Sequence, residues 1–240
     1  MKYSIVIPTY NHCDDLLKPC VESILKYTDM SEVELIISGN GCVDNTRQYL
    51  EEMWTGFNRY GFEKNFKVAW SDTPTGFAKA TNDGIKRSTG DKIILLNNDI
   101  ILLEQKKNDW LNYLIEPFHS NPNCGISCIV KQKCDAIDKY FAVFFCVMVD
   151  RKVFNKIGLL NEEYGIGSGE DVEFCIEAEK AGFEICQAGE KHWSNEINSW
   201  SGYFPIYHKG EGTVHDQSLV PNWSEVFTNN HKKLADKYNV

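Results

Sequence analysis

Three polar residues interrupt an apolar run near the middle of the chain. The segment ILLNNDIILL, residues 94–103, places Asn97, Asn98 and Asp99 between two groups of Ile and Leu. A carboxylate at such a point is well suited to ligate a hard cation, Mg²⁺ or Mn²⁺, that bridges a diphosphate. Asn and Asp are also common turn residues. By themselves, these residues are therefore consistent with a metal site or with a polar β-turn.

A second acidic pair, Glu170 and Asp171, follows the glycine-rich turn GIGSG. A carboxylate in this position can act as a general base that takes the proton from a hydroxyl group. The structural alternative is a capping box, S-x-x-D, in which Ser168 and Asp171 open a helix. The N-terminus of a helix also stabilises the ionised carboxyl group and so weakens it as a base. On these residues alone, the capping box is favoured.

The segments around these residues predict an α/β fold. Short apolar runs are typical of buried parallel strands, and amphipathic segments between them predict helices. The strands are expected at residues 4–8, 33–38 and 92–96, and the helices at 16–27, 44–53 and 77–88. This alternation indicates βαβ units around a mostly parallel sheet. Because such sheets bind ligands at the carboxyl ends of their strands, residues 97–99 would lie at the ligand-binding edge.

The second half of the chain predicts a less regular continuation. One apolar strand, two helices, an aromatic-rich stretch and a final amphipathic helix are expected at residues 140–149, 151–157, 171–181, 192–207 and 223–238. No linker, repeat or low-complexity segment divides the chain, so we expect one domain over residues 1–240. The apolar face of the last helix would dock onto that domain or form a homodimer, and the sequence leaves both open.

The composition restricts the partners and the location of the protein. Lys and Arg total 25 and Asp and Glu total 34, which gives a net charge of −9. This balance argues against nucleic acid and against an anionic lipid surface, but not against a nucleotide held through a cation. Nine cysteines without a repeated spacing predict reduced thiols and a cytoplasmic location. The longest uncharged apolar run is about half the length needed to span a bilayer, so no integral membrane segment is expected.

Three segments, in order along the chain, resemble the family 2 glycosyltransferases of the GT-A fold. They are SIVIPTYN, TGFAKATNDGIKRSTGDKIILLNND and GIGSGEDVEFCIEAEKAGFEI. The resemblance implies a single α/β GT-A domain with a central, mostly parallel sheet flanked by helices. Residues 1–103 would form the nucleotide-sugar-binding half, residues 104–220 the acceptor-binding and catalytic half, and residues 221–240 a C-terminal helix. The NND sequence is similar to that of a rhamnosyltransferase-like subgroup.

The resemblance implies a donor nucleotide site built from several segments. The matching positions are Pro8, Thr9, Tyr10, Asn40, Gly76, Phe77 and Asn98. Gly39 and Asn40 stand where the family usually has one or two aspartates. The identity of the nucleobase therefore stays open, and the expected donor is a UDP-, dTDP- or GDP-sugar.

The resemblance also assigns roles to the acidic residues. It implies that Asp99 ligates Mn²⁺ or Mg²⁺ and that Asp171 is the general base, which reverses the preference for a capping box. Glu170 and Glu173 are the alternatives to Asp171. Glu170 is also expected beside the acceptor, together with Trp193 and Trp200, because aromatic faces suit sugar stacking.

A C-terminal histidine often completes the metal site in this family, and imidazole suits Mn²⁺. The candidates are His192, His208 and His215. His208 is preferred because it follows a strand-like run, YFPIY, that is similar to the family's final strand.

The function predicted from this resemblance is that of an inverting, metal-dependent glycosyltransferase in glycan biosynthesis. It would move a hexosyl or deoxyhexosyl group from a nucleoside diphosphate to a hydroxyl group of a glycan, lipid-linked or protein acceptor. The alternative is a catalytically silent nucleotide-sugar-binding domain, because some of the family's aspartates are missing. A dehydrogenase is excluded because GNGCVD lacks the third glycine of a dinucleotide loop. The spacing of Cys124, Cys128 and Cys134 matches no common zinc site.

Overall fold

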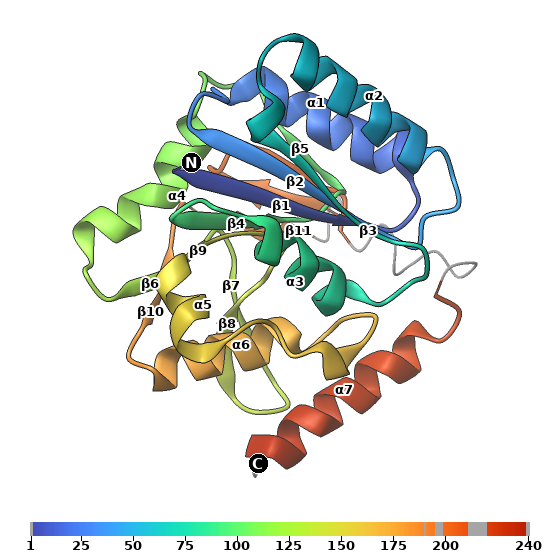
Figure 1. Ribbon diagram of the computed structural model, residues 1–240. Coiled ribbons are helices and arrows are strands. Elements are labelled where there is room, and N and C mark those ends of the chain that lie inside the picture. Colours follow the sequence, from blue (N-terminus) through green and yellow to red (C-terminus); the bar gives the residue numbers. More distant parts are fainter. Residues whose placement is uncertain (1, 190, 195–198, 211–219, 239–240) are drawn as a thin grey trace.

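A seven-stranded sheet forms the centre of the computed structural model, which describes residues 2–189, 191–194, 199–210 and 220–238 (Figure 1). The strands lie in the order β10-β6-β9-β4-β1-β2-β3. In chain order they are β1 Tyr3–Thr9, β2 Val33–Asn40, β3 Phe66–Ser71, β4 Lys92–Leu96, β6 Cys124–Cys128, β9 Cys146–Asp150 and β10 Glu184–Gln187. Only β9 runs antiparallel to its neighbours β4 and β6. The predicted α/β class with a mostly parallel sheet is confirmed.

Helices cover both faces of this sheet (Figure 1). On one face pack α1 Lys18–Tyr27, α2 Thr46–Arg59 and α4 Asp109–Ser120, and on the other α3 Phe77–Arg87, α5 Arg151–Ile157 and α6 Glu170–Lys180. Successive side chains of a strand point to opposite faces. Ile5 and Ile7 of β1 accordingly join the first core and Val6 joins the second. The strands are continuous apolar runs because both of their faces are buried.

The elements predicted in the first half of the chain are confirmed. The largest difference is at α2, which continues to Arg59 instead of ending at residue 53. No element was predicted at β3, an edge strand in which Phe66 and Ala69 are buried and the other residues are half-buried. Seven of the nine cysteines are buried, and all nine are free thiols. Within the described residues, no helix combines the length and the apolar character needed to cross a membrane.

The prediction of one strand over residues 140–149 is wrong. The run contains β8 Lys139–Ala142, which forms a hairpin with β7 Lys131–Cys134, and β9, which enters the central sheet between β4 and β6. Val143, Phe144 and Phe145 separate the two strands. Because the residues before and after this break are equally apolar, the hydrophobic pattern gives no sign of the change of sheet.

The aromatic-rich stretch forms further strands. β11 Lys191–Ser194 pairs with β12 Ser199–Gly202, and β13 Ile206–His208 runs antiparallel to β5 Ile100–Leu102. The register of the second pair sets His208 opposite Ile100. The pairing of β13 with β5 thus returns the chain to the segment that carries the polar residues 97–99. The last helix, α7 Trp223–Tyr238, has the predicted bounds.

A buried carboxylate, Glu34, ties together the amino-terminal ends of the central strands. Its side chain is fully buried and accepts hydrogen bonds from the Ser4 hydroxyl (2.6 Å), the Lys67 ammonium (2.6 Å) and the Thr89 amide (2.5 Å). Burial raises the pKa of Glu34, but these hydrogen bonds act in the opposite direction and leave its pKa below the ordinary value. The ionised form of Glu34 therefore stabilises the fold.

We expect Glu34→Ala to lower the free energy of unfolding by about 3–5 kcal/mol, because it leaves the partners of a buried ion pair unsatisfied. The pKa of Glu34 is lower in the folded state than in the unfolded state. The ionised carboxylate therefore stabilises the fold at pH values above the unfolded-state pKa, and this stabilisation is lost as the pH falls towards the folded-state pKa. Denaturant titration between pH 3 and 7 tests both points, with the exposed Glu32→Ala as the control. Equal stability of the two variants would contradict this role.

Candidate functional site

The carboxyl ends of β1 and β4 bring two of the predicted donor residues into contact. The strands are parallel neighbours, with Ile5 in register with Ile94. The Asn98 amide donates a hydrogen bond of 2.9 Å to the Thr9 hydroxyl, and both side chains are buried. Pro8 is buried within β1, and Tyr10 is half-buried directly after it. The polar residues 97–99 thus lie at the sheet edge where α/β folds bind ligands.

Asp99 and His208 meet at the same edge. The Asp99 Oδ1 atom lies 3.1 Å from the His208 Nε2 atom, and both side chains are buried. The pairing of β5 with β13 produces this contact, because Asp99 directly precedes β5 and His208 is the last residue of β13. The ring of Phe145 stacks on the imidazole, with centroids 4.1 Å apart and planes 9° from parallel. Sequence reasoning missed Phe145, since nothing distinguishes it from its apolar neighbours.

The separation of Asp99 and His208 suits a shared divalent cation. Metal–ligand distances of about 2.1 Å place two neighbouring ligands of an octahedral ion about 3 Å apart, close to the 3.1 Å observed. One carboxylate and one imidazole are a donor set that Mn²⁺ accepts. In the described part of the chain, no group of three or more His, Cys, Asp or Glu side chains is arranged to hold a metal ion. The pair would therefore supply only part of a coordination shell, and phosphate and water would have to supply the other ligands.

The other histidine candidates have no described side chain. His192 lies in β11, where its backbone pairs with Ser201, and only the backbone is described there. His215 lies outside the described residues. Trp193 and Trp200, the predicted acceptor contacts, are register partners across β11 and β12, and their side chains are likewise not described. Of the three histidines, His208 is the one that the structure brings to Asp99.

The loop before α3 is held by Asn40. The Asn40 Oδ1 atom accepts hydrogen bonds from the Thr75 amide (2.6 Å) and hydroxyl (2.9 Å), and its Nδ2 atom lies 3.4 Å from the Gly76 carbonyl oxygen. Asn40 is buried, so its side chain shapes the predicted donor loop from within. Gly76 has φ +91° and no room for a side chain, since a Cβ atom would lie 2.0 Å from the Gly165 carbonyl oxygen.

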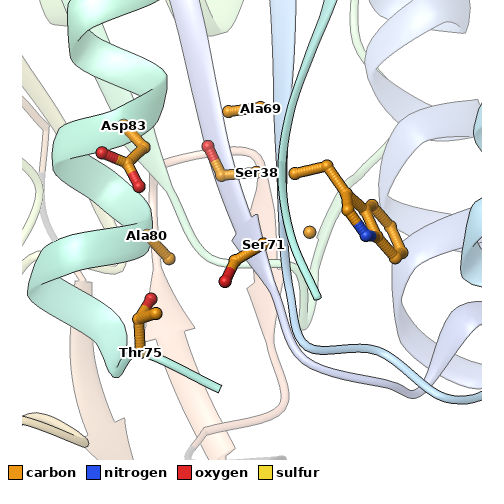
Figure 2. Close-up of a pocket in the computed structure, with 8 residues that line it drawn as sticks. Ser38, Ala69, Ser71, Thr75, Ala80 and Asp83 are labelled. Atoms are coloured by element: carbon orange, nitrogen blue, oxygen red, sulfur yellow. The ribbon is translucent and has the colours of Figure 1, made fainter. Parts of the chain in front are cut away.

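A small pocket lies between α3 and the ends of β2 and β3. Figure 2 shows Thr75 and Asp83 on the α3 side, opposite Ser38 and Ser71 of the strands. Gly39 also lines the pocket, and a Cβ atom there would come within 2.3 Å of the Trp70 ring. The position where the resemblance leads one to expect an aspartate is thus filled by a packed tryptophan, which explains why this chain carries glycine.

The predicted capping box at the start of α6 is wrong. The helix begins at Glu170, and its N-cap is Gly169, which makes no side-chain hydrogen bond. Ser168 turns away, and its hydroxyl oxygen lies 3.2 Å from the His231 Nε2 atom. The Asp171 carboxylate accepts a hydrogen bond of 2.8 Å from the backbone amide of Val172, the next residue of the helix.

The two carboxyl groups of this pair are hard to ionise. Burial raises the pKa of Asp171, and the backbone amides around it, including that of Val172, oppose the shift without cancelling it. Burial also raises the pKa of Glu170, and repulsion from Asp171 adds to that rise. Among the described residues, the buried Glu170 Oε2 atom has no hydrogen-bond partner. The weakening of the base by the helix N-terminus is therefore smaller than the effect of burial.

Glu173, the remaining alternative for the base, is engaged in contacts with three other side chains. It accepts hydrogen bonds from the Tyr164 hydroxyl (2.7 Å) and the Asn161 amide (3.1 Å), and Lys237 of α7 lies 2.8 Å away. These three partners occupy its carboxylate oxygens. Asp171 and Glu170 are thus better placed for proton transfer than Glu173.

The break between β8 and β9 links the acidic pair with the Asp99–His208 pair. The backbone amide of Phe144 is among those that lower the pKa of Asp171. The next residue, Phe145, stacks on His208 and accepts a hydrogen bond of 2.9 Å from the Asn97 amide through its carbonyl oxygen. The Asp99–His208 pair and the Asp171 carboxylate thus contact consecutive residues of the same break. Such an arrangement can hold a diphosphate and activate a hydroxyl group.

Proteins of known sequence are similar to this chain. The sequence model of Glycosyl transferase family 2 matches residues 4–142. A poly-beta-1,6-N-acetyl-D-glucosamine synthase from Staphylococcus epidermidis is 29% identical over 124 residues, which cover 51% of this chain and 26% of that protein. Protein y4gI from Sinorhizobium fredii is 22% identical over 85% of this chain and 24% of its own length. The chain thus spans about a quarter of the length of these relatives.

Solved structures share the fold. The mannosyltransferase PcManGT from Pyrobaculum calidifontis, in complex with GDP-Man and Mn²⁺, has a TM-score of 0.62 at 14% identity, covering 78% of this chain and 54% of that chain. TarS from S. aureus, in complex with UDP-GlcNAc, has a TM-score of 0.57 at 16% identity, covering 97% of this chain and 73% of that chain. These similarities confirm the expected GT-A fold.

Proposed function

Because the chain belongs to glycosyl transferase family 2, we propose that it transfers a sugar from a nucleoside-diphosphate donor to a hydroxyl acceptor, with inversion at the anomeric carbon. The observation that carries the proposal is the buried contact of 3.1 Å between Asp99 and His208 at the ligand-binding edge of the sheet. A carboxylate and an imidazole at this spacing fit neighbouring positions around one divalent cation.

In the proposed reaction, Asp171 accepts the proton of the acceptor hydroxyl. The acceptor oxygen attacks the anomeric carbon, the bond between that carbon and the diphosphate oxygen breaks, and the diphosphate leaves with the electron pair. A single displacement of this kind inverts the configuration. A carboxylate whose pKa burial has raised is a stronger base than an exposed aspartate, which supports this role for Asp171.

Mn²⁺ or Mg²⁺, held by Asp99 and His208, would neutralise the charge of the departing diphosphate. Thr9 at the end of β1 and Asn98 after β4 would bind the nucleoside. Asn40 would keep the loop at Gly76 in place beside the nucleotide. The contact of Asn40 with that loop supports a positioning role rather than recognition of the nucleobase.

The donor is proposed to be a UDP-, dTDP- or GDP-sugar that carries a hexosyl or deoxyhexosyl group. The solved neighbours support the GDP and UDP members of this range, because PcManGT was solved with GDP-Man and TarS with UDP-GlcNAc. The acceptor is proposed to be a hydroxyl group of a glycan, of a lipid-linked intermediate or of a protein. We also propose that the chain belongs to a rhamnosyltransferase-like subgroup, for which the NND sequence of residues 97–99 is the support.

A thermal-shift panel of UDP, GDP, dTDP and CDP, each with Mn²⁺, Mg²⁺ or EDTA, tests the proposal. A ligand at a hundred times its dissociation constant stabilises a protein by about 2.7 kcal/mol, which corresponds to a rise in Tm of roughly 5–10 °C for a domain of this size. We expect stabilisation by one diphosphate and its loss in EDTA. Binding of a nucleotide sugar without any release of nucleoside diphosphate would instead support the catalytically silent domain.

A further inference from the structure

The C-terminal helix α7 is hydrogen bonded to the loop that precedes the acidic pair. The Asn230 amide of α7 donates to the carbonyl oxygens of Tyr164 (2.9 Å) and Gly167 (2.8 Å), and Asn230 is buried. The Lys233 ammonium donates to the carbonyl oxygen of Glu163 (2.6 Å). Figure 1 shows α7 on the side of the molecule that carries α6. None of these contacts involves a residue that the proposed reaction uses.

The loop has a backbone conformation that needs support. Gly165, Gly167, Ser168 and Gly169 all have positive φ angles, of 61°, 143°, 70° and 110°. Ser168 carries a side chain in a region that favours glycine, and such a residue stays there only where its surroundings hold it. The three glycines adopt these angles without strain, so Ser168 is the residue of this loop whose conformation depends on the contacts around it.

The opposite side of the loop touches the predicted donor loop. The amide of Phe77 donates a hydrogen bond of 3.0 Å to the Gly165 carbonyl oxygen. Close packing leaves little free space, since a Cβ atom at Gly169 would lie 2.7 Å from the Tyr164 ring and 3.3 Å from Leu234 of α7. The loop is therefore enclosed between the start of α3 and α7, and the pair Glu170 and Asp171 follows it.

We propose that Asn230 is a positioning residue for the general base: its two hydrogen bonds hold the loop of residues 164–169 so that Asp171 faces the acceptor. The inference rests on the proposed function, because that function gives the geometry of the loop a consequence for transfer. Asn230 does not touch the substrate in this proposal and acts through the loop alone. α7 then takes part in the reaction, because its docking fixes the base. The donor loop has a support of its own, since Asn40 of β2 accepts hydrogen bonds from the Thr75 amide and hydroxyl.

The test compares Asn230→Asp with Asn229→Asp. Asn230→Asp has nearly the same shape but replaces the amide donor by an oxygen that repels both carbonyl groups. Asn229 is exposed on the same helix, so Asn229→Asp makes the same change of charge without touching the loop. If Asn230→Asp does not fold, Asn230→Ser removes the amide without adding charge and takes its place.

Three quantities are measured for each variant. Hydrogen exchange follows the amides of residues 165–173, a titration gives the Kd of the nucleoside diphosphate with Mn²⁺, and release of that diphosphate from UDP-GlcNAc or GDP-Man, with water as the acceptor, gives kcat between pH 4 and 9. For Asn230→Asp we expect exchange to rise at least about tenfold, Kd to stay within about twofold, and kcat to fall on the order of 100-fold, as for a small misplacement of a reacting group.

The pH profile separates positioning from general loss of structure. A loosened loop admits water to Asp171, which reduces the rise of its pKa and moves the acidic limb of kcat to lower pH. Faster exchange with an unchanged kcat and an unchanged acidic limb would overturn the positioning role, and unchanged exchange would overturn the contact on which it depends. Failure of the proposed function is recognised separately, because the unmodified protein would then release no diphosphate at any pH.

Discussion

Asp171→Asn is expected to lower kcat by about 10²–10⁴-fold, the range that a general base contributes. The change replaces a carboxylate by an amide of the same shape, so the nucleotide keeps its contacts and its Kd should not change. Steady-state kinetics with a nucleotide sugar, together with a titration of the nucleoside diphosphate, measures both quantities. The exposed Glu179→Gln on the same helix is the control. A kcat close to that of the unmodified protein would transfer the role to Glu170.

The pH dependence of the reaction follows from the pKa of the same residue. Burial raises the pKa of Asp171 above its ordinary value of 3.8. A base acts only when ionised, so kcat falls as the pH drops through this raised pKa, and the midpoint lies above that of an exposed aspartate. Because this pKa is raised, the ionised Asp171 carboxylate destabilises the folded state relative to the unfolded state. Asp171→Asn should therefore melt no lower than the unmodified protein at pH 7, which separates lost chemistry from lost folding.

Asp99→Asn is expected to weaken the binding of the nucleoside diphosphate in Mn²⁺ by at least about 100-fold. Loss of a residue that only supports a metal ligand already costs about 10–100-fold in metal affinity, and Asp99 is proposed as a ligand itself. The physical reason is that the amide carries no charge with which to hold the cation that bridges the diphosphate. Calorimetric titration in Mn²⁺ and in EDTA measures the effect.

The control for this second prediction is Asp91→Asn, which removes an exposed carboxylate close to the start of β4. It should bind the nucleotide as the unmodified protein does. In EDTA, where no cation contributes, Asp99→Asn and the unmodified protein should differ little. Equal affinity of the two proteins in Mn²⁺ would remove Asp99 from the metal site and would leave residues 97–99 as a polar turn.

Local pattern predicted strands β1, β2 and β4 and, among the described α-helices, all except α4. The buried strands β1, β2 and β4 were recognisable because both of their faces are covered, which makes their sequences mostly apolar. Helices α3, α5 and α7 were recognisable from their spacing and their flanking residues. The run of residues 140–149 was misassigned because the change from one sheet to another leaves the hydrophobic pattern intact.

The acidic pair shows the same limit at the level of a site. The spacing of Ser168 and Asp171 satisfies a capping box, yet Ser168 faces His231 of α7. A helix that lies far along the chain thus decides which of two local hydrogen-bond patterns forms. No local rule contains that partner, so the sequence favoured a cap that the structure does not have.

The sequence by itself determined the α/β class, the strands β1, β2 and β4, and the polar residues 97–99 after β4, because these depend on periodicity and on residue type. Only the tertiary structure decided that His208 meets Asp99, that Phe145 stacks on that histidine, and that Asn230 holds the loop before Asp171. Each of these contacts joins residues far apart in the chain. Their geometry follows from strand register and helix docking, which arise only when the whole chain packs.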